Sequence, residues 1–268
     1  MDEEKILRKY ARKADPQSLP PTIRFEYDEH TLTVYDAYPK SVFHFLILPR
    51  IVPPLTAGRL ASLRTLLQGD KAQAKEVLDR LDAAAKIVRE QIEAEMLNRF
   101  GYKWSIWTGF HAVQSMEHVH LHVISSDLCS PSMKNKKHYN SFHPEHGFFL
   151  PLEEILSWPE AEPSWYATMS ELRPSQYEPF LKESLSCWRC YKEFKNMPLL
   201  KEHLQEEWDA EAKRERARLE RKQKLEQDRL KKADRGESPS AKRQRESSPS
   251  DPEPKRQRAD SPSQSTQD

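Results

Sequence analysis

Three histidines at alternate positions, His118, His120 and His122, form the stretch with the clearest chemical potential. Aliphatic residues separate them, so an extended strand would place the three imidazoles on one face and bury the aliphatic side chains on the other. Alternate residues of a strand lie roughly 6.5–7 Å apart, whereas zinc requires each ligand within about 2.1 Å. A metal-binding or solvent-facing strand is one interpretation, but the spacing is poor for a shared ion. A neutral imidazole nitrogen is also a good nucleophile toward phosphorus at neutral pH.

A second group with chemical potential consists of Cys187, Cys190, His203 and Glu207. The spacing is that of a two-cysteine, two-histidine zinc finger in which glutamate replaces the last histidine. Cysteines three residues apart and two ligands one helical turn apart predict tetrahedral coordination of one structural Zn²⁺ ion. Incidental cysteines beside a helix are the alternative, and the fourth ligand is open between Glu207, Glu206 and water.

The elements that must position these residues are predicted from periodicity and composition. Runs rich in β-branched and aromatic residues predict strands at 23–27, 31–36, 42–48, 103–110 and 117–125. Helices are expected at 4–14, 56–68 and 71–99, the last with apolar residues at spacings of three and four. Residues 127–150 are expected to form a polar loop. Strands with a helical pair inserted between them indicate an α+β fold with an antiparallel sheet.

Charge is distributed unevenly along the 268 residues. Residues 211–268 carry 17 Lys and Arg against 12 Asp and Glu, a net charge of +5, whereas residues 1–210 carry 26 against 30, a net charge of −4. Any nucleic-acid surface on the body must therefore be local. We predict a catalytic domain at 1–150, a zinc-finger module at 151–209, and a charged helix with a disordered tail at 210–268.

Few cysteines, no secretory signal and no long apolar run together indicate a reducing compartment and no membrane partner. In the tail, basic clusters at 242–245 and 255–258 predict a nuclear address, and a tail that only increases solubility is the alternative. Serines that precede proline beside these clusters, at which phosphorylation would weaken import, are Ser238, Ser248 and Ser261.

The pattern His-x-His-x-His flanked by aliphatic residues resembles the histidine-triad (HIT) superfamily of nucleotide hydrolases and transferases. Three further segments resemble the aprataxin family within it: Asp36-Ala37-Tyr38-Pro39-Lys40 followed by His44, the approach 111–116, and the loop 134–142. The resemblance covers about 35–142, and the finger extends it to about 209. It implies a HIT-like sheet followed by a C2HE-type finger, in a fungal-like form without a forkhead-associated domain.

By this resemblance the substrate is nicked or double-stranded DNA whose 5′ end carries AMP after an aborted ligation, and AMP is a product. His120 would be the nucleophile of a covalent adenylyl-histidine, and the catalytic set is completed by His118, His122 and His111. Positions that match phosphate- or substrate-binding residues are Asp36, Lys40, Ser115, Lys136, Lys137 and His138. Tyr10 in the N-terminal helix is the candidate wedge at the DNA end.

Two other functions stay open. One is a HIT hydrolase of small nucleotides, such as dinucleoside polyphosphates or nucleoside phosphoramidates. The other is a zinc-finger DNA-binding protein whose HIT domain is inactive. The finger and the lysine-rich loop 134–142 argue against the first function, since a small substrate needs neither. The complete triad argues against the second. We therefore expect a monomeric DNA-adenylate hydrolase.

Overall fold

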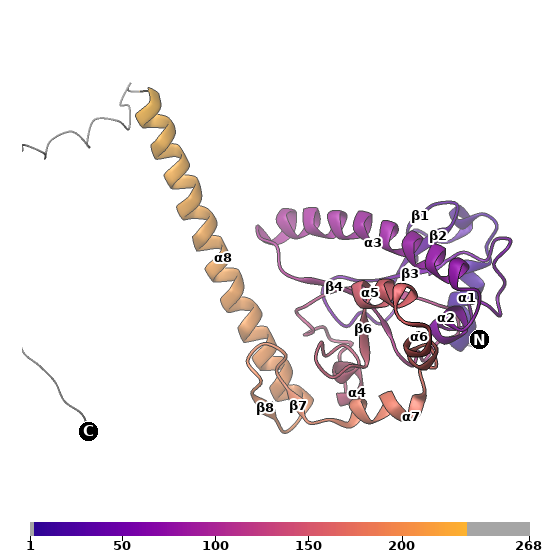
Figure 1. Ribbon diagram of the computed structural model, residues 1–268. Coiled ribbons are helices and arrows are strands. Elements are labelled where there is room, and N and C mark those ends of the chain that lie inside the picture. Colours follow the sequence, from indigo (N-terminus) through magenta and orange to yellow (C-terminus); the bar gives the residue numbers. More distant parts are fainter. Residues whose placement is uncertain (1–2, 235–268) are drawn as a thin grey trace, which may run out of the picture. The chain divides into compact units, whose positions relative to one another are not determined.

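The computed structural model describes residues 3–234 (Figure 1). The predicted disordered tail, with its two basic clusters and its Ser-Pro sites, lies outside these residues. The chain forms one compact unit at Met1–Arg218, and a second unit begins at Leu219. The boundaries predicted at 150 and 209 stay predictions. No helix in the described part of the chain is long and apolar enough to cross a membrane.

The centre of the first unit is an antiparallel sheet, six-stranded over residues 3–234, with the order β1-β2-β3-β5-β4-β6. Its strands are β1 (Arg24–Tyr27), β2 (Thr31–Tyr35), β3 (His44–Pro49), β4 (Ile106–His111), β5 (Leu121–Ser125) and β6 (Phe149–Pro151). The prediction of an α+β fold with an antiparallel sheet is confirmed.

Helices surround the sheet, and a small hairpin precedes the last of them. The helices are α1 (Ile6–Ala11), α2 (Leu63–Leu67), α3 (Lys71–Phe100), α4 (Lys136–Asn140), α5 (Leu152–Ser157), α6 (Pro163–Met169), α7 (Pro174–Tyr177) and α8 (Met197–Asp234). The hairpin pairs β7 (Leu185–Ser186) with β8 (Glu193–Phe194). Single 3₁₀ turns lie at Glu3–Lys5, Pro16–Ser18, Trp158–Glu160 and Glu178–Lys182.

One face of the sheet is covered by α3. Its apolar residues at spacings of three and four, among them Val77, Leu81, Val88 and Ile92, are buried. The helix packs on β3, β5 and β2, where the alternation of side chains places Phe45, Ile47 and Val123 on the covered face. The Asp70 side chain caps its first turn, and Gly101 ends it with a φ of 76°.

The opposite face carries the histidines between two apolar clusters. On one side, Leu46 and Leu48 of β3 pack with Leu7 and Ala11 of α1. On the other, Ile124 of β5 packs with the hairpin and the start of α8 through Leu185, Cys187 and Leu200. His122 pairs with Leu46, and His44 pairs with Ile124, so both rings lie between the clusters. The sheet thereby places the histidines between the N-terminal helix and the finger.

Three predicted boundaries were wrong. The strand expected at 117–125 begins only at Leu121, because His118 has a φ of 105° and the N–H groups of His118 and Val119 bond to Ala61 and Leu60 in a loop. The helix expected at 56–68 is α2 alone, since Ser62 and Thr65 form a capping box immediately before it. The loop expected at 127–150 contains α4, capped by the Asn135 side chain, and β6.

Candidate active site and zinc site

His120 is held in one tautomer by the backbone carbonyl of His118. Its Nδ1 lies 2.8 Å from the carbonyl oxygen of His118. A carbonyl only accepts, so Nδ1 carries the proton and the lone pair is on Nε2. Burial lowers the pKa of His120 below its ordinary value of 6.5, so the ring is neutral at pH 7. The geometry presents a neutral imidazole nitrogen as a nucleophile.

The His118 carbonyl that orients His120 is itself fixed. The Gln114 side-chain amide donates to it at 3.0 Å and also to the carbonyls of Ala61 and Met116. The His118 ring is fully buried, and its Nε2 donates to the carbonyl of Pro49 at 2.7 Å. Burial lowers its pKa to about 4. The ring thus anchors the end of β3, and its predicted catalytic role stays a prediction.

His122 is oriented by a chain of hydrogen bonds. The backbone N–H of Lys40 donates to Nδ1 of His44 at 3.2 Å, which leaves the proton of His44 on Nε2. That nitrogen lies 3.0 Å from Nδ1 of His122, which must accept, so the proton of His122 is on Nε2. This Nε2 is buried without a partner in the protein. A buried donor with no partner is suited to a ligand oxygen.

His44 lies between Asp36 and His122. Burial lowers its pKa to about 4, consistent with a neutral relay. An oxygen of Asp36 lies 3.7 Å from its Nδ1, while the other oxygen of Asp36 accepts from the Tyr38 N–H at 2.7 Å. Asp36, His44 and His122 also have ligand atoms within 4.8 Å of one another, but the hydrogen bond between the two rings occupies two of the nitrogens.

His111 completes the ring cluster. Its centroid lies 4.4 Å from that of His122, and Phe142 and Phe148 pack beside it. Its Nε2 is buried without a protein partner, and burial lowers its pKa well below 6.5. The unpartnered nitrogens of His111 and His122 therefore lie in one cluster with His120.

Lys40 is a partly buried cation close enough to this cluster to act on it electrostatically. The charge of Lys40 contributes to the lowered pKa of His44, His111, His122 and His138. Burial lowers the pKa of Lys40 itself, and this effect outweighs the charge of Asp36, which raises that pKa. The ammonium donates to the carbonyl of Tyr38. The cation is placed to interact with negative charge brought to the histidines.

A hollow of about 580 Å³ lies between α1 and strands β2 and β3, and its lining includes Leu46, which pairs with His122. Its walls are mainly apolar, and they include Ile6, Leu7, Tyr10, Val34, Leu46 and Met116, with Asp36 and Ser115 as polar lining residues. Tyr10 packs against the cluster that anchors α1, and it also lines this hollow. A mainly apolar hollow with a few polar groups is suited to a nucleoside.

The lysine-rich segment is attached to the finger. Lys136 and Lys137 are exposed on α4 and His138 is half-buried. The hydroxyl of Tyr139, next in the chain, donates to the carbonyl of Ser186 at 2.8 Å and accepts from the N–H of Trp188 at 3.0 Å. The finger therefore fixes the short helix that carries the two lysines.

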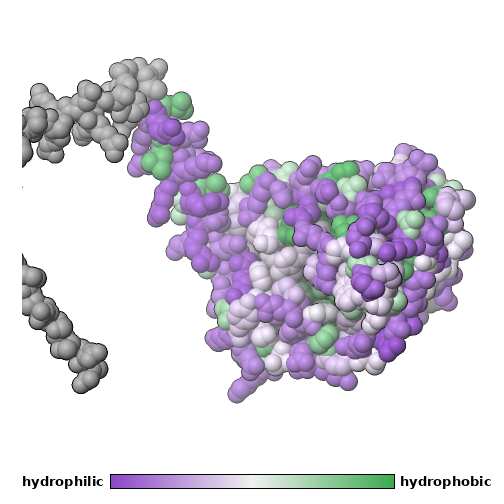
Figure 2. Space-filling model, viewed as in Figure 1, coloured by the Kyte–Doolittle hydropathy of each residue, from purple (hydrophilic) through white to green (hydrophobic). Residues whose placement is uncertain are grey.

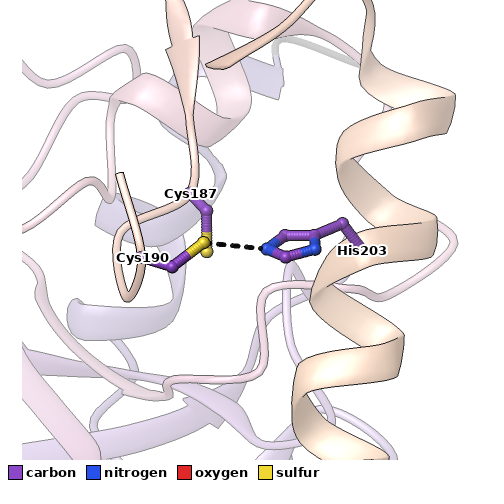
Figure 3. A group of neighbouring side chains, drawn as sticks. All are labelled: Cys187, Cys190 and His203. Atoms are coloured by element: carbon purple, nitrogen blue, oxygen red, sulfur yellow. Dashed lines mark hydrogen bonds between the residues drawn. The ribbon is translucent and has the colours of Figure 1, made fainter. Parts of the chain in front are cut away.

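The predicted zinc ligands converge in part. Cys187 and Cys190 follow β7, His203 lies on α8, and their ligand atoms are all within 4.8 Å of one another (Figure 3). The Cys190 sulfur is 3.2 Å from Nε2 of His203. Two thiols and an imidazole at this separation fit a zinc ion. Glu207 lies one turn along α8, with an oxygen 3.7 Å from Nε2 of His203, but it is not part of this group of three, so the fourth ligand stays a prediction.

Gln114 and Tyr139 are site residues that the sequence did not single out as such. Gln114 orders the His118 carbonyl, and Tyr139 ties α4 to the finger. Gln114 bonds to Ala61 and His118 in loops, and Tyr139 bonds to Ser186 and Trp188, which are distant in sequence. No periodic pattern predicts such contacts. The position of Tyr139 directly after His138 was the one signal available.

Comparisons with known proteins agree with this architecture. A family model described as "C2HE / C2H2 / C2HC zinc-binding finger" matches residues 145–210. One described as "Scavenger mRNA decapping enzyme C-term binding" matches residues 5–138. The fold and its histidine cluster therefore define a HIT-like protein with a C2HE finger.

Curated relatives and solved structures narrow the family. The chain is 31% identical to aprataxin of Gallus gallus over 188 residues, covering 70% of this chain and 52% of the relative. It is 33% identical to an aprataxin-like protein of Schizosaccharomyces pombe over 190 residues, covering 68% and 73%. A crystal structure of the aprataxin ortholog Hnt3 in complex with DNA matches with a TM-score of 0.59 and 27% identity, covering 78% of this chain and 96% of that one. The chain belongs to the aprataxin family, and it spans about half the length of its vertebrate relatives.

Proposed function

We propose that the protein is a DNA 5′-adenylate hydrolase. It would remove AMP from abortive ligation intermediates through a covalent adenylyl-histidine during single-strand break repair. The observation that carries this proposal is the orientation of His120, whose Nε2 lone pair is set by the 2.8 Å bond from Nδ1 to the His118 carbonyl. The solved relative with DNA supports the choice of substrate.

The proposed reaction has two displacements at one phosphorus. Nε2 of His120 attacks the phosphorus of the AMP group, and the bond to the DNA 5′-phosphate breaks. That leaving group has a last pKa of roughly 6, so it departs without a strong general acid. Water then attacks the same phosphorus and the P–N bond breaks, which releases AMP, while the proton of the water passes to the departing imidazole.

The other residues of the cluster would stabilise charge rather than form bonds. The buried Nε2 proton of His122 and the ammonium of Lys40 are the donors for the phosphoryl oxygens in both steps. His111 and Ser115 are proposed to hold the same phosphate or the ribose beside it. The apolar hollow would take the adenosine.

DNA would be bound on both sides of the histidines. Lys136, Lys137 and His138 would contact phosphates from α4, and Tyr10 of α1 is the proposed wedge at the terminal base pair. We propose that the finger holds one structural Zn²⁺ through Cys187, Cys190, His203 and Glu207. Four protein ligands leave no open position, so zinc would stabilise the finger.

We further propose that the protein acts as a monomer in the nucleus. The two basic clusters at 242–245 and 255–258 would direct import, and phosphorylation of Ser238, Ser248 or Ser261 would weaken it. The test is the distribution of a tagged protein truncated after residue 235. Nuclear accumulation of the truncated protein would refute the import role.

The alternative function is hydrolysis of small nucleotides. The match of residues 5–138 to the decapping-enzyme model favours it. Turnover of a 5′-adenylated nicked duplex and of a diadenosine polyphosphate separates the two functions. We expect a higher kcat/KM on the duplex, and no AMP release from either by His120→Ala. Normal release by that variant would exclude the mechanism, and preference for the dinucleotide would establish the alternative.

A further inference from the structure

Helix α8 continues well past the finger. The finger model ends at residue 210, whereas α8 is helical to Asp234. The solved Hnt3 chain is covered almost completely by 78% of this protein, so part of the present chain has no counterpart there. Residues 220–231, in the distal part of α8, are all exposed, and Figure 2 shows this part as mainly hydrophilic.

Charge in the distal part of α8 is segregated around the helix. Successive residues of an α-helix are about 100° apart. The five basic residues of 219–231 therefore fall on one half of the circumference, which we call the basic face: Arg221, Lys222, Lys224, Arg229 and Lys231. One acid, Asp228, shares that half. The other half carries Glu220 and Glu226 and, within 219–231, has no basic residue.

The apolar residues here do not form a seam for another helix. Leu219, Leu225 and Leu230 are separated by six and five residues, which is not a heptad pattern. Leu225 and Leu230 are 65% and 66% exposed. A second copy of the chain would find no continuous apolar stripe, so charge is the recognition feature of this segment.

We propose that the basic face binds the phosphate backbone of duplex DNA away from the adenylated end. The inference rests on the proposed function for its ligand and extends the DNA footprint beyond the active site and the finger. Arg221 to Lys231 span about 15 Å of helix at 1.5 Å per residue. Duplex DNA carries one charge per roughly 1.7 Å of axis, so phosphates are dense enough to meet all five cations. Within 219–231 the basic face carries one apolar residue, Leu225, and no apolar stripe, so binding should be independent of sequence and sensitive to salt.

The test compares two double variants with the same change in net charge on opposite faces. Arg221→Gln with Lys224→Gln removes two cations from the basic face. Gln223→Glu with Gln227→Glu adds two anions to the other half. Gln, Glu, Lys and Arg have similar helix propensities, and circular dichroism checks that the helix is retained. The zinc-loaded full chain is titrated, at several salt concentrations, into unadenylated duplexes of about one and about three helical turns.

We expect the basic-face variant to lose several-fold in affinity for the long duplex and little for the short one. Its slope of log K against log salt should fall by about 1.8, the release from two phosphates, while the opposite-face variant keeps the wild-type slope. Equal losses in both variants, or none, would overturn the proposal, as would equal affinity of the wild type for both duplexes. AMP release from adenylated DNA is measured in parallel, so a failure of the catalytic proposal is visible separately from the binding result.

Discussion

At the scale of single residues, the site is a set of tautomers fixed by carbonyl and amide partners. Three histidines of one motif have three surroundings: His118 is tied to Pro49, His120 to a backbone carbonyl, and His122 to His44. Two of these partners lie far away in sequence. The same residue type therefore provides a structural anchor, the proposed nucleophile and the proposed donor, depending on which nitrogen each partner leaves free.

The relay through His44 yields a specific expectation. His44→Leu removes the donor to Nδ1 of His122, so the His122 ring can flip and lose its inward proton. The loss of one buried hydrogen bond, about 1.4 kcal/mol, should lower kcat for AMP release about tenfold with little change in KM. In His44→Gln the side-chain amide can still donate, so kcat should recover in part. Equal losses in both variants would mean that His44 acts only through packing.

The pH dependence of catalysis follows from the lowered pKa of His120. Protonation at Nε2 would occupy the attacking lone pair, so activity is lost as pH falls through this pKa. Because burial places it below 6.5, the acid limb of kcat/KM should have its midpoint below 6.5. Steady-state rates on adenylated duplex from pH 4.5 to 8 locate it. A midpoint at or above 6.5 would show that a different group controls the limb.

The sequence predicted which residues come together better than how they are held. Cys187, Cys190 and His203 lie on spacings that local geometry alone dictates, and they converge. The bonds that set the His120 tautomer depend on Gln114 and on the φ of 105° at His118. The positions of Gln114 and His118 depend in turn on hydrogen bonds to Ala61 and Pro49, which no local pattern encodes.

At the scale of elements, the same limit appears at strand and helix ends. Alternation and period-3.6 patterns predicted β2, β3 and α3 to within a few residues, because burial of one face is a strong local signal. They failed for α2, α4 and the start of β5. Side-chain caps at Ser62 and Asn135 set the starts of α2 and α4, and hydrophobic periodicity does not report such caps. Hydrogen bonds to Ala61 and Leu60, which are tertiary contacts, delay the start of β5.

The finger and the catalytic sheet share one apolar cluster. Cys187 and Leu200 pack with Ile124, Phe142 and Tyr139. Hydrogen bonds from Asn140 to the carbonyl of Glu183, at 2.9 Å, add to those of Tyr139. Unfolding of the finger would therefore release α4, which carries the lysines proposed to contact DNA, before it disturbs the position of His120.

Loss of the metal should consequently separate the two activities. In Cys187→Ala we expect zinc content to fall from one ion per chain to none, because a unit this small has little core without its metal. AMP release from adenylated DNA should fall at least tenfold more than hydrolysis of a small adenylated compound. Cys129→Ala, a cysteine outside the zinc group, is the matched control and should keep both activities. Proportional loss of both activities in Cys187→Ala would make the finger part of the catalytic fold.

At the scale of the whole molecule, the buried histidines link folding to pH. His44, His118 and His143 each have a pKa of about 4, lowered chiefly by burial. His143 is stacked on His146 with ring centroids 3.8 Å apart, between α4 and β6. In the unfolded chain such rings titrate near 6.5. Between these values the unfolded state binds protons that the native state cannot.

The stability of the protein should therefore decrease as pH falls below 6.5 and continue to fall toward pH 4. Keeping each of the three histidines neutral has almost no cost above pH 6.5. By pH 5 each of them lowers the free energy of unfolding by about 2 kcal/mol. Urea unfolding at pH 7, 6 and 5 measures the trend, with excess zinc present so that release of the ion by protonated cysteines is not mistaken for it. His143→Phe keeps an aromatic ring in the stack but takes up no proton, so its slope of unfolding free energy against pH should be smaller by up to about 1.4 kcal/mol per pH unit. If the wild type is as stable at pH 5 as at pH 7, the histidines are protonated in the folded state and their burial does not control stability. If the unfolding free energy of the wild type falls with pH but His143→Phe has the same slope, the dependence on pH comes from the histidines around His120 and not from the stacked pair.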